Sequence, residues 1–162
     1  QDPHPAIRRV PVRSALEMKA ALEGSLEAGA DVVIMAAAVA DFRPKDVAAE
    51  KIKKSKDAEE GRVLELVRNP DILAGLGAAR TGTRPLLVGF ALETSDVVVR
   101  ARDKLERKKV DLIVGNLARD GFGKDDNLVT LVDAHSATEL PRGTKRTLAD
   151  AILDRVAALI AR

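Results

Sequence analysis

Val32-Val-Ile-Met-Ala-Ala-Ala-Val39 is the stretch that decides the fold class. It is an apolar run without a polar position, and it has the length of a strand. A strand in a parallel sheet is covered on both faces, so its sequence is continuously hydrophobic and does not alternate. Leu86-Leu-Val-Gly-Phe-Ala-Leu92 shares this character, and Asp111-Leu-Ile-Val-Gly-Asn116 has a similar apolar centre between two polar residues. The three runs predict the central strands of a mostly parallel sheet.

Helical signals stand between these strands. Ser14-Ala-Leu-Glu17 is a capping box, which predicts a helix that ends near Gly29. Asn69 and Pro70 predict a second helix start, with Asn69 as the N-cap and Pro70 in the first helical position. We expect this second helix to run towards Gly82.

The remaining segments complete the predicted order of elements. A third helix is expected near residues 95–109, and the polar stretch 43–62 is expected to be a loop. Residues 128–132 and 137–140 are expected to pair as a hairpin. A closing amphipathic helix is predicted from the helical spacing of Leu148, Ile152, Val156 and Leu159.

Strands that alternate with helices define the predicted fold class as α/β. We expect a Rossmann-like, doubly wound, mostly parallel sheet with helices on both faces, plus a small C-terminal β-hairpin. Residues 1–162 are expected to form a single domain. Such folds usually open with a strand and a glycine-rich turn, whereas this chain begins with a tail and a helix. We therefore expect the N-terminal βα portion of the domain to be lacking.

The composition excludes several classes of function. The 162 residues include no cysteine and only two histidines, which rules out a cysteine nucleophile, a zinc–thiolate site and a multi-histidine metal cage. Three phenylalanines are the only aromatic residues, too few for a nucleic-acid binder that relies on base stacking. No apolar run approaches the ~20 residues of a membrane span, and the first residues lack the core of a secretory signal. We therefore expect a cytoplasmic domain that binds neither nucleic acid nor a membrane.

Charge is distributed unevenly, although the formal net charge is only +2. Residues 43–56 carry six basic and two acidic groups, and residues 100–109 carry the same numbers. The rest of the chain is therefore acidic overall. Two local basic patches on an acidic body suggest a small polyanionic ligand, since a nucleic-acid surface usually shows a broader basic excess.

Polar residues follow the predicted strands, at the edge where ligands bind in open α/β sheets. Asp41, Glu93 and Asn116 occupy these positions. Asp41 is a candidate ligand for Mg²⁺, or for a ribose or base, and is equally well explained as a turn residue. Glu93 and Asn116 are more simply explained as polar residues that cap strand ends.

Cations, a helix start and an aromatic residue supply further candidates. The run Lys51-Ile-Lys53-Lys54-Ser55-Lys56 suits a triphosphate clamp, although a solvated loop is the simpler explanation and the P-loop pattern is missing. The turn Asn69–Ile72 leaves backbone N–H groups free, as an anion site or a plain helix cap. Lys104 and Lys108 share a helical face near the apolar stripe, so each needs an anion nearby or extends to solvent. Phe90 is either core or a wall for a planar base.

Together these segments resemble the phosphopantothenoylcysteine synthetase family, the phosphopantothenate–cysteine ligases of coenzyme A biosynthesis. In most bacteria this ligase is the C-terminal half of a bifunctional protein whose N-terminal half is an FMN-dependent decarboxylase. The resemblance covers nearly the whole chain and rests on Ala36-Ala-Ala-Val-Ala-Asp-Phe-Arg-Pro44, Glu50-Lys-Ile-Lys-Lys54, Asn69-Pro-Asp-Ile-Leu73, Val88-Gly-Phe-Ala-Leu-Glu-Thr94, Lys104, Lys108, Asp111–Asn116 and Gly121-Phe122.

The resemblance implies a Rossmann-like homodimer that uses CTP and Mg²⁺ to join 4′-phosphopantothenate to cysteine through an acyl-cytidylate. It implies that Lys51 is catalytic and contacts the phosphates and the transition state, and that Asp41 contacts the nucleotide. Backbone groups around Ala37 and Ala38 are implied to read the cytosine. The other implied nucleotide-binding positions are Asn69, Pro70, Asp71, Ile72, Phe90, Lys104 and Lys108.

The chain departs from the family pattern at its N-terminal side. The family's Gly-Gly-Thr type loop and its Asn-Arg-Ser-Ser-Gly-Lys type segment, which handles the acyl intermediate, do not occur in this sequence. Two alternatives stay open. One is the ATP-using version of the same ligase, and the other is a nonenzymatic nucleotide-binding module of the kind that related flavoprotein-inhibitor subunits represent.

Overall fold

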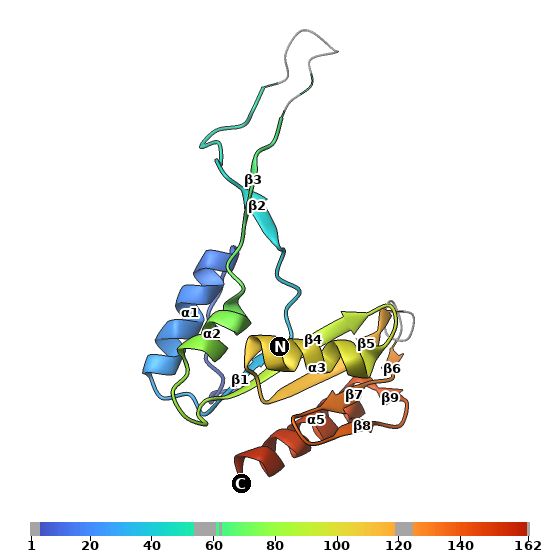
Figure 1. The fold of residues 1–162 in the computed structure, drawn as a ribbon. Coiled ribbons are helices and arrows are strands. Elements are labelled where there is room, and N and C mark those ends of the chain that lie inside the picture. The colour runs from blue at the N-terminus through green and yellow to red at the C-terminus, as the bar shows by residue number, and fades with distance from the viewer. Residues whose placement is uncertain (1–3, 54–60, 62, 119–124, 162) are drawn as a thin grey trace.

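The computed structural model describes residues 4–53, 61, 63–118 and 125–161. A five-stranded sheet in the order β1-β4-β5-β7-β8 forms its centre (Figure 1). The first three strands in this order are parallel, and the last two continue the sheet in antiparallel fashion. The predicted α/β class with a mostly parallel sheet is confirmed. The strands are β1 (Val32–Met35), β4 (Leu86–Glu93), β5 (Leu112–Leu117), β7 (Thr130–Val132) and β8 (Ala137–Glu139).

Strand β1 is shorter and less covered than the sequence predicts. Only Val32–Met35 pair with β4, and residues 36–40 leave the sheet. β1 is an edge strand, and Ile34 on it is 39% exposed, so the expectation of cover on both faces is wrong here. The pairing of β1 with β4 stops at Met35 and Gly89, although β4 itself continues to Glu93, so the apolar run is longer than the strand.

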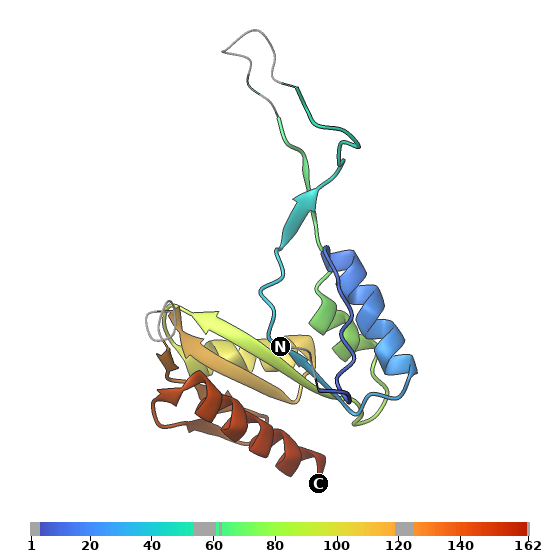
Figure 2. The ribbon, with the colours of Figure 1, turned by 180° about the vertical axis from the view of Figure 1, so that it is seen from behind.

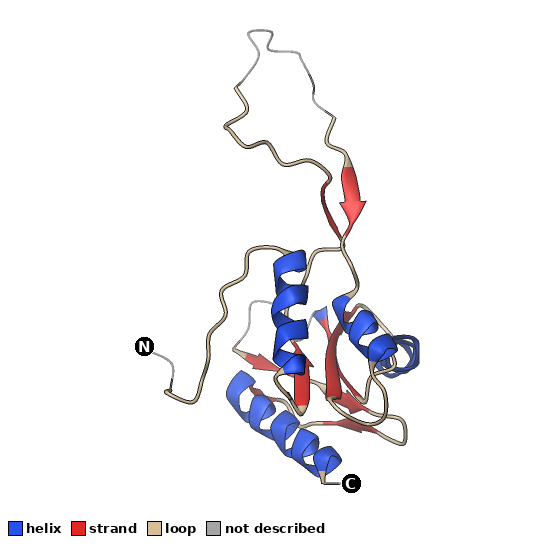
Figure 3. Ribbon diagram, turned by 90° about the vertical axis from the view of Figure 1, so that its left-hand side faces the viewer, coloured by secondary structure: helices blue, strands red, loops and turns tan. Residues whose placement is uncertain are grey.

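Helices cover both faces of the sheet, as predicted (Figures 2 and 3). Leu87 and Ile113 point to the face where α1, α2 and α3 pack. Val88 and Leu112 point to the opposite face, which α5 covers. None of the helices in the described ranges is both long enough and apolar enough to cross a membrane. The helices are α1 (Ala15–Glu27), α2 (Ile72–Ala79), α3 (Val97–Lys108) and α5 (Lys145–Ile160).

Helix α1 begins at the predicted capping box. The Ser14 hydroxyl accepts a hydrogen bond from the Glu17 amide at 3.2 Å, and the Glu17 carboxylate accepts one from the Arg13 amide at 2.7 Å. Gly29, in the left-handed region at φ 89°, follows the end of the helix as expected. The predicted closing helix is α5, and its apolar stripe is buried against the sheet.

Helix α2 begins two residues later than predicted. Asp71, not Asn69, is the N-cap, and its carboxylate accepts a hydrogen bond from the Ala74 amide at 3.1 Å. The reason is that the side chain of Asn69 is engaged elsewhere, with the carbonyl of Ala40. The helix also ends at Ala79, before the predicted limit near Gly82.

A two-stranded arm replaces part of the predicted loop at 43–62. Strands β2 (Phe42–Pro44) and β3 (Leu66–Arg68) pair in antiparallel fashion and project from the body of the molecule (Figure 1). The predicted hairpin is confirmed as β7–β8, and it is part of the main sheet because β7 pairs with β5. A second small pair joins β6 (Asp126–Asn127) to β9 (Gly143–Thr144).

Gly77 allows α2 to pack closely against the end of α3. A Cβ at this position would overlap the carbonyl oxygen of Lys108 and lie 3.0 Å from that of Lys109. Both atoms belong to the backbone, so a side-chain rotation cannot relieve the overlap. Gly75, on the same helix, has no atom within 4 Å of its would-be Cβ. Close packing therefore requires glycine at position 77 but not at position 75.

We expect Gly77→Ala and Gly75→Ala to change stability in opposite directions. Overpacking against α3 should cost Gly77→Ala roughly 1–3 kcal/mol or more of unfolding free energy. Gly75→Ala should add about 0.5–1 kcal/mol, because alanine is the better helix former and meets no obstacle. Urea denaturation of both variants measures the difference, and equal stability of the two would contradict the close α2–α3 contact.

Candidate functional site

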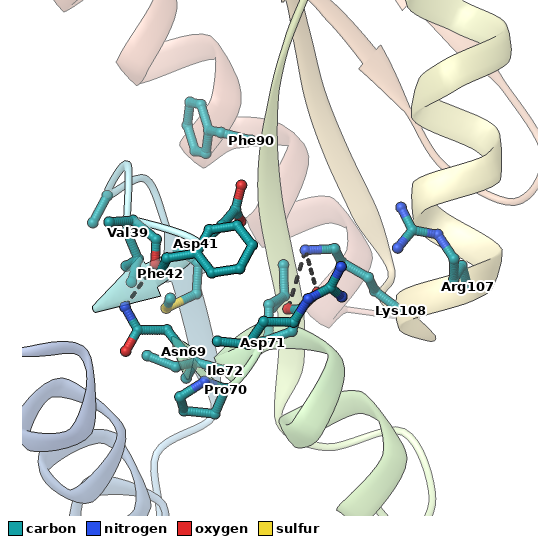
Figure 4. Close-up of a pocket in the computed structure, with 15 residues that line it drawn as sticks. Val39, Asp41, Phe42, Asn69, Pro70, Asp71, Ile72, Phe90, Arg107 and Lys108 are labelled. Atoms are coloured by element: carbon teal, nitrogen blue, oxygen red, sulfur yellow. Dashed lines mark hydrogen bonds and ion pairs between the residues drawn. The ribbon is translucent and has the colours of Figure 1, made fainter. Parts of the chain in front are cut away.

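A pocket of about 430 Å³ lies at the carboxyl ends of β1 and β4 (Figure 4). The loop after β1, the segment that leads into α2 and the end of α3 form its walls. This is the edge at which open α/β sheets bind ligands. The lining residues are Met35, Ala37, Val39, Ala40, Asp41, Phe42, Arg68, Asn69, Pro70, Asp71, Ile72, Leu73, Phe90, Arg107 and Lys108.

The pocket brings together most of the positions that the sequence singles out. The predicted residues that line it are Ala37, Asp41, Asn69, Pro70, Asp71, Ile72, Phe90 and Lys108. The predicted residues that do not line it are Ala38, Lys51 and Lys104. These segments are far apart in the sequence, and the parallel sheet places them side by side. What each residue binds stays a prediction.

Asn69 fastens the loop after β1 to the start of α2. Its amide side chain donates a hydrogen bond to the carbonyl of Ala40 at 2.8 Å and accepts one from the Arg43 guanidinium at 3.2 Å. Its backbone N–H donates to the carbonyl of Asp41 at 2.8 Å. The loop therefore has a defined position next to the pocket, although no strand partner holds it.

Asp71 and Lys108 form an ion pair at the pocket wall (Figure 4). The ammonium lies 3.0 Å from one carboxylate oxygen and 3.1 Å from the other. Partial burial by itself would raise the pKa of Asp71. The hydrogen bond from the Ala74 amide and the cation of Lys108 outweigh it, so the pKa of this carboxyl lies below its ordinary value. Asp71 is thus ionised at neutral pH, and its carboxylate bonds both the Ala74 amide and the Lys108 ammonium.

Lys104 has a protein partner as well, outside the pocket. Its ammonium lies 2.7 Å from a carboxylate oxygen of Glu93, whose side chain is only 10% exposed at the end of β4. Arg100 adds a longer contact of 3.8 Å to the same carboxylate. Both lysines near the apolar stripe of α3 therefore do meet an anion. In each case that anion is a carboxylate of this chain.

Two phenylalanines give the pocket an apolar wall. Phe90 is 40% exposed and lines the cavity, so the explanation of Phe90 as core is wrong and the explanation as a wall fits. Phe42 also lines the pocket, with the guanidinium of Arg68 5.8 Å from its ring centre. An aromatic face beside cations suits a planar, charged ligand such as a nucleotide.

Phe42, Arg68 and Arg107 also line the pocket, although they are not among the predicted site residues. Phe42 had a usable signal, because it directly follows Asp41 and belongs to the small set of aromatic residues. Arg107 lies within the basic patch at 100–109 and precedes Lys108. Arg68 had no such signal, since its place depends on the pairing of β3 with β2.

Lys51 lies on the arm and is exposed. It is not among the lining residues of the pocket. Lys54 and Lys56 of the predicted clamp lie outside the described residues, as do Gly121 and Phe122. Of the predicted lysine clamp, the structure therefore describes only residues 51–53.

Asp41 is the one predicted metal ligand. Within the described ranges, no group of three or more acidic or histidine side chains gathers as a metal site would require. Mg²⁺ is commonly bound through one or two carboxylates together with substrate phosphates, and does not need an all-protein cage. Asp41 lines the pocket and fits this mode, whereas Asp71 is already paired with Lys108.

The fold and the pocket define an α/β domain with a cavity, lined in part by charged side chains, at the carboxyl edge of its sheet. Residues 1–160 match the family described as DNA/pantothenate metabolism flavoprotein C-terminal domain. The chain belongs to this family, which confirms the resemblance seen in its motifs.

Curated relatives include bifunctional proteins of coenzyme A biosynthesis. The chain is 43% identical over 150 residues to "Coenzyme A biosynthesis bifunctional protein CoaBC" of Vibrio cholerae, which covers 91% of this chain and 37% of the relative. It is 44% identical over 155 residues to the protein of the same name from Bacillus subtilis. This match covers 93% of this chain and 36% of the relative. The chain thus spans less than two fifths of the length of these relatives.

Solved structures share the fold. The C-terminal domain of a CoaBC protein matches with a TM-score of 0.77 and 33% identity, covering 99% of this chain and 70% of that one. A DNA/pantothenate metabolism flavoprotein from Streptococcus pneumoniae matches with a TM-score of 0.73 and 21% identity, covering 98% and 74%. The second match shows a common fold alone.

We expect Asn69→Ala to loosen the pocket loop and to lower the unfolding free energy by about 1–2 kcal/mol, because two side-chain hydrogen bonds are lost. Asn69→Asp is the sharper variant. It can still accept from Arg43 but cannot donate to the carbonyl of Ala40. Hydrogen exchange at the amide of Asn69, which is bonded to Asp41, reports the loosening in both variants. Wild-type protection in Asn69→Asp would show that the bond to Ala40 does not hold the loop.

Proposed function

We propose that this domain is a phosphopantothenate–cysteine ligase that uses a nucleoside triphosphate to activate its acid substrate. The observation that carries the proposal is one pocket that combines an aromatic wall with cations at the carboxyl edge of the sheet. Membership of the family and likeness to coenzyme A biosynthesis proteins support the choice of reaction. A nonenzymatic nucleotide-binding module is the competing proposal, and product formation separates the two.

In the proposed reaction the carboxylate of 4′-phosphopantothenate attacks the α-phosphorus of CTP. The bond to the β-phosphate breaks, pyrophosphate leaves, and an acyl-cytidylate remains. The cysteine amine then attacks the acyl carbon and releases CMP, and the amine loses a proton as the amide forms. The chain's part is to position these groups and to offset negative charge on the leaving pyrophosphate. Lys108 and Arg107 stand at the pocket wall for this purpose.

CTP is the nucleotide that we favour over ATP. Ala37 lines the pocket in a loop that has left the sheet, so its backbone groups are not engaged with a neighbouring strand. Backbone N–H and C=O groups at that point can distinguish the hydrogen-bonding edge of cytosine from that of adenine. Ala38 is exposed on the same loop, and we propose that its backbone shares this role with Ala37.

Mg²⁺ is proposed to bind Asp41 together with the nucleotide phosphates. When bound there, the ion would offset phosphate charge and orient the triphosphate. The protein's contribution is to hold the Asp41 carboxylate in the pocket. Its backbone is fixed by the hydrogen bond from Asn69 to the carbonyl of Asp41.

A homodimer is proposed from the arm. Large apolar side chains on it are highly exposed, including Val63 at 99% and Val47 at 84%. An exposed apolar surface on a projecting arm marks a protein interface, and we propose a second copy of this chain as the partner. We propose that the arm contacts the partner at its pocket, so that Lys51 meets the nucleotide bound there.

The proposal further includes a βα unit next to β1 and an FMN-dependent decarboxylase in the same polypeptide. β1 is an edge of the described sheet, and the face beside it leaves Ile34 and Leu92 exposed. Another strand and helix would pair with this edge and cover this face. The substrates are charged metabolites that do not cross membranes, so we place the reaction in the cytoplasm.

The test is pyrophosphate release by the full-length protein with Mg²⁺ and either CTP or ATP. Release with CTP that requires 4′-phosphopantothenate, followed by CMP release on addition of cysteine, is the expected result. Release with ATP in preference to CTP would support the proposed ligase reaction but would show that ATP is its nucleotide. Calorimetric binding of nucleotide without any release of pyrophosphate would favour the nonenzymatic module.

We expect Lys51→Gln to lower pyrophosphate release by about 10²-fold or more, because a cation is removed from the developing charge of the transition state. The unfolding free energy should hardly change, since Lys51 is exposed. Lys45→Gln is the matched control: Lys45 lies on the same arm and pairs with Glu65 at 2.8 Å. Wild-type release by Lys51→Gln would remove Lys51 from the catalytic machinery.

A further inference from the structure

Helix α3 directs two cations towards the carboxyl edge of the sheet, one turn apart. Lys104 meets Glu93, and Lys108 meets Asp71. Only Lys108 reaches the pocket, and only Asp71 of the two carboxylates lines it. The pocket therefore contains a cation whose position is fixed by an anion at its own wall.

A negative charge in a pocket for a triphosphate is a cost, because it repels the ligand at close range. Asp71 has no need to be acidic for its local structural task. Asparagine caps a helix about as well as aspartate, and the bond from the Ala74 amide needs only a side-chain oxygen. The acidity of Asp71 thus points to its second partner, the ammonium of Lys108.

The flexibility of the Lys108 side chain is the reason why an ion-pair partner such as Asp71 is useful. A lysine side chain is long and flexible, and ordering it at the moment of reaction costs conformational entropy. The Lys108 side chain is 21% exposed, and its ammonium contacts both oxygens of Asp71 at 3.0 and 3.1 Å. The close α2–α3 contact at Gly77 keeps the two partners in reach. The ammonium is therefore already placed when a ligand arrives.

We propose that Asp71 is a positioning residue, which holds Lys108 ready for the phosphates of the nucleotide and weakens nucleotide binding in exchange for faster turnover. The inference rests on the proposed function, because it assigns the phosphates as the groups that Lys108 meets. Asp71 itself does not need to touch the reacting atoms.

Asp71→Asn isolates this role, because it keeps the helix cap and removes the charge partner. In the full-length protein we expect kcat for pyrophosphate release to fall about tenfold, while KM for the nucleotide is unchanged or lower. Asp150→Asn, the same chemical change on α5, is expected to leave both constants unaltered; Asp150 pairs only with Arg146 among the interactions described. A rise in KM at constant kcat, or wild-type constants, would overturn the proposal.

A second readout needs no turnover. Inorganic pyrophosphate serves as the probe in calorimetric titrations of the wild type, Asp71→Asn, Lys108→Gln and the double variant. Asp71→Asn should bind it two- to tenfold more tightly, and the effects of the two substitutions should be non-additive by at least threefold. Additive effects would overturn the positioning of Lys108. The titrations could show the expected coupling between Asp71 and Lys108 while the wild-type protein releases no pyrophosphate from any nucleotide. That result would refute the proposed function and leave the positioning of Lys108 intact.

Discussion

The close approach of α2 to the C-terminal end of α3 is the contact on which the site depends. Gly77 makes it feasible, because any side chain at that position would overlap the backbone of Lys108. The same contact sets the distance between the N-cap of α2 and the last turn of α3. Asp71 and Lys108 can meet only at that distance, so a packing requirement inside the domain also determines the electrostatics of the pocket.

The length of β1 is a second constraint, and it acts on the other wall. The strand ends at Met35, and the apolar run continues as a loop whose backbone is released from strand pairing. Asn69 then fixes this loop from the opposite side, through its bond to the carbonyl of Ala40. A longer β1 would engage these backbone groups in a sheet and leave the pocket without the wall that Ala37 and Asp41 provide.

Much of the fold could be predicted from the sequence because it follows from local rules. Continuous apolar runs located β4 and β5, and the Ser14 capping box located α1. Prediction failed where a distant partner decided between two local options. Asn69 and Asp71 are both good N-caps, and the choice fell to Asp71 because Ala40 takes the side chain of Asn69. The arm escaped prediction for a related reason, since β2 exists only through its pairing with β3.

The candidate site shows the same division. Positions at strand ends, such as Asp41, were accessible to sequence reasoning because all parallel strands end at one edge of the sheet. The partners of the lysines were not, because helical spacing shows the direction of a side chain and not what it meets. Lys104 and Lys108 lie one helical turn apart. Lys104 meets Glu93, whereas Lys108 meets Asp71 at the pocket wall. This single turn separates a cation paired at the end of β4 from one paired at the wall of the pocket. In the function that we propose, any difference in role between the two lysines comes from placement, since the residue types are identical.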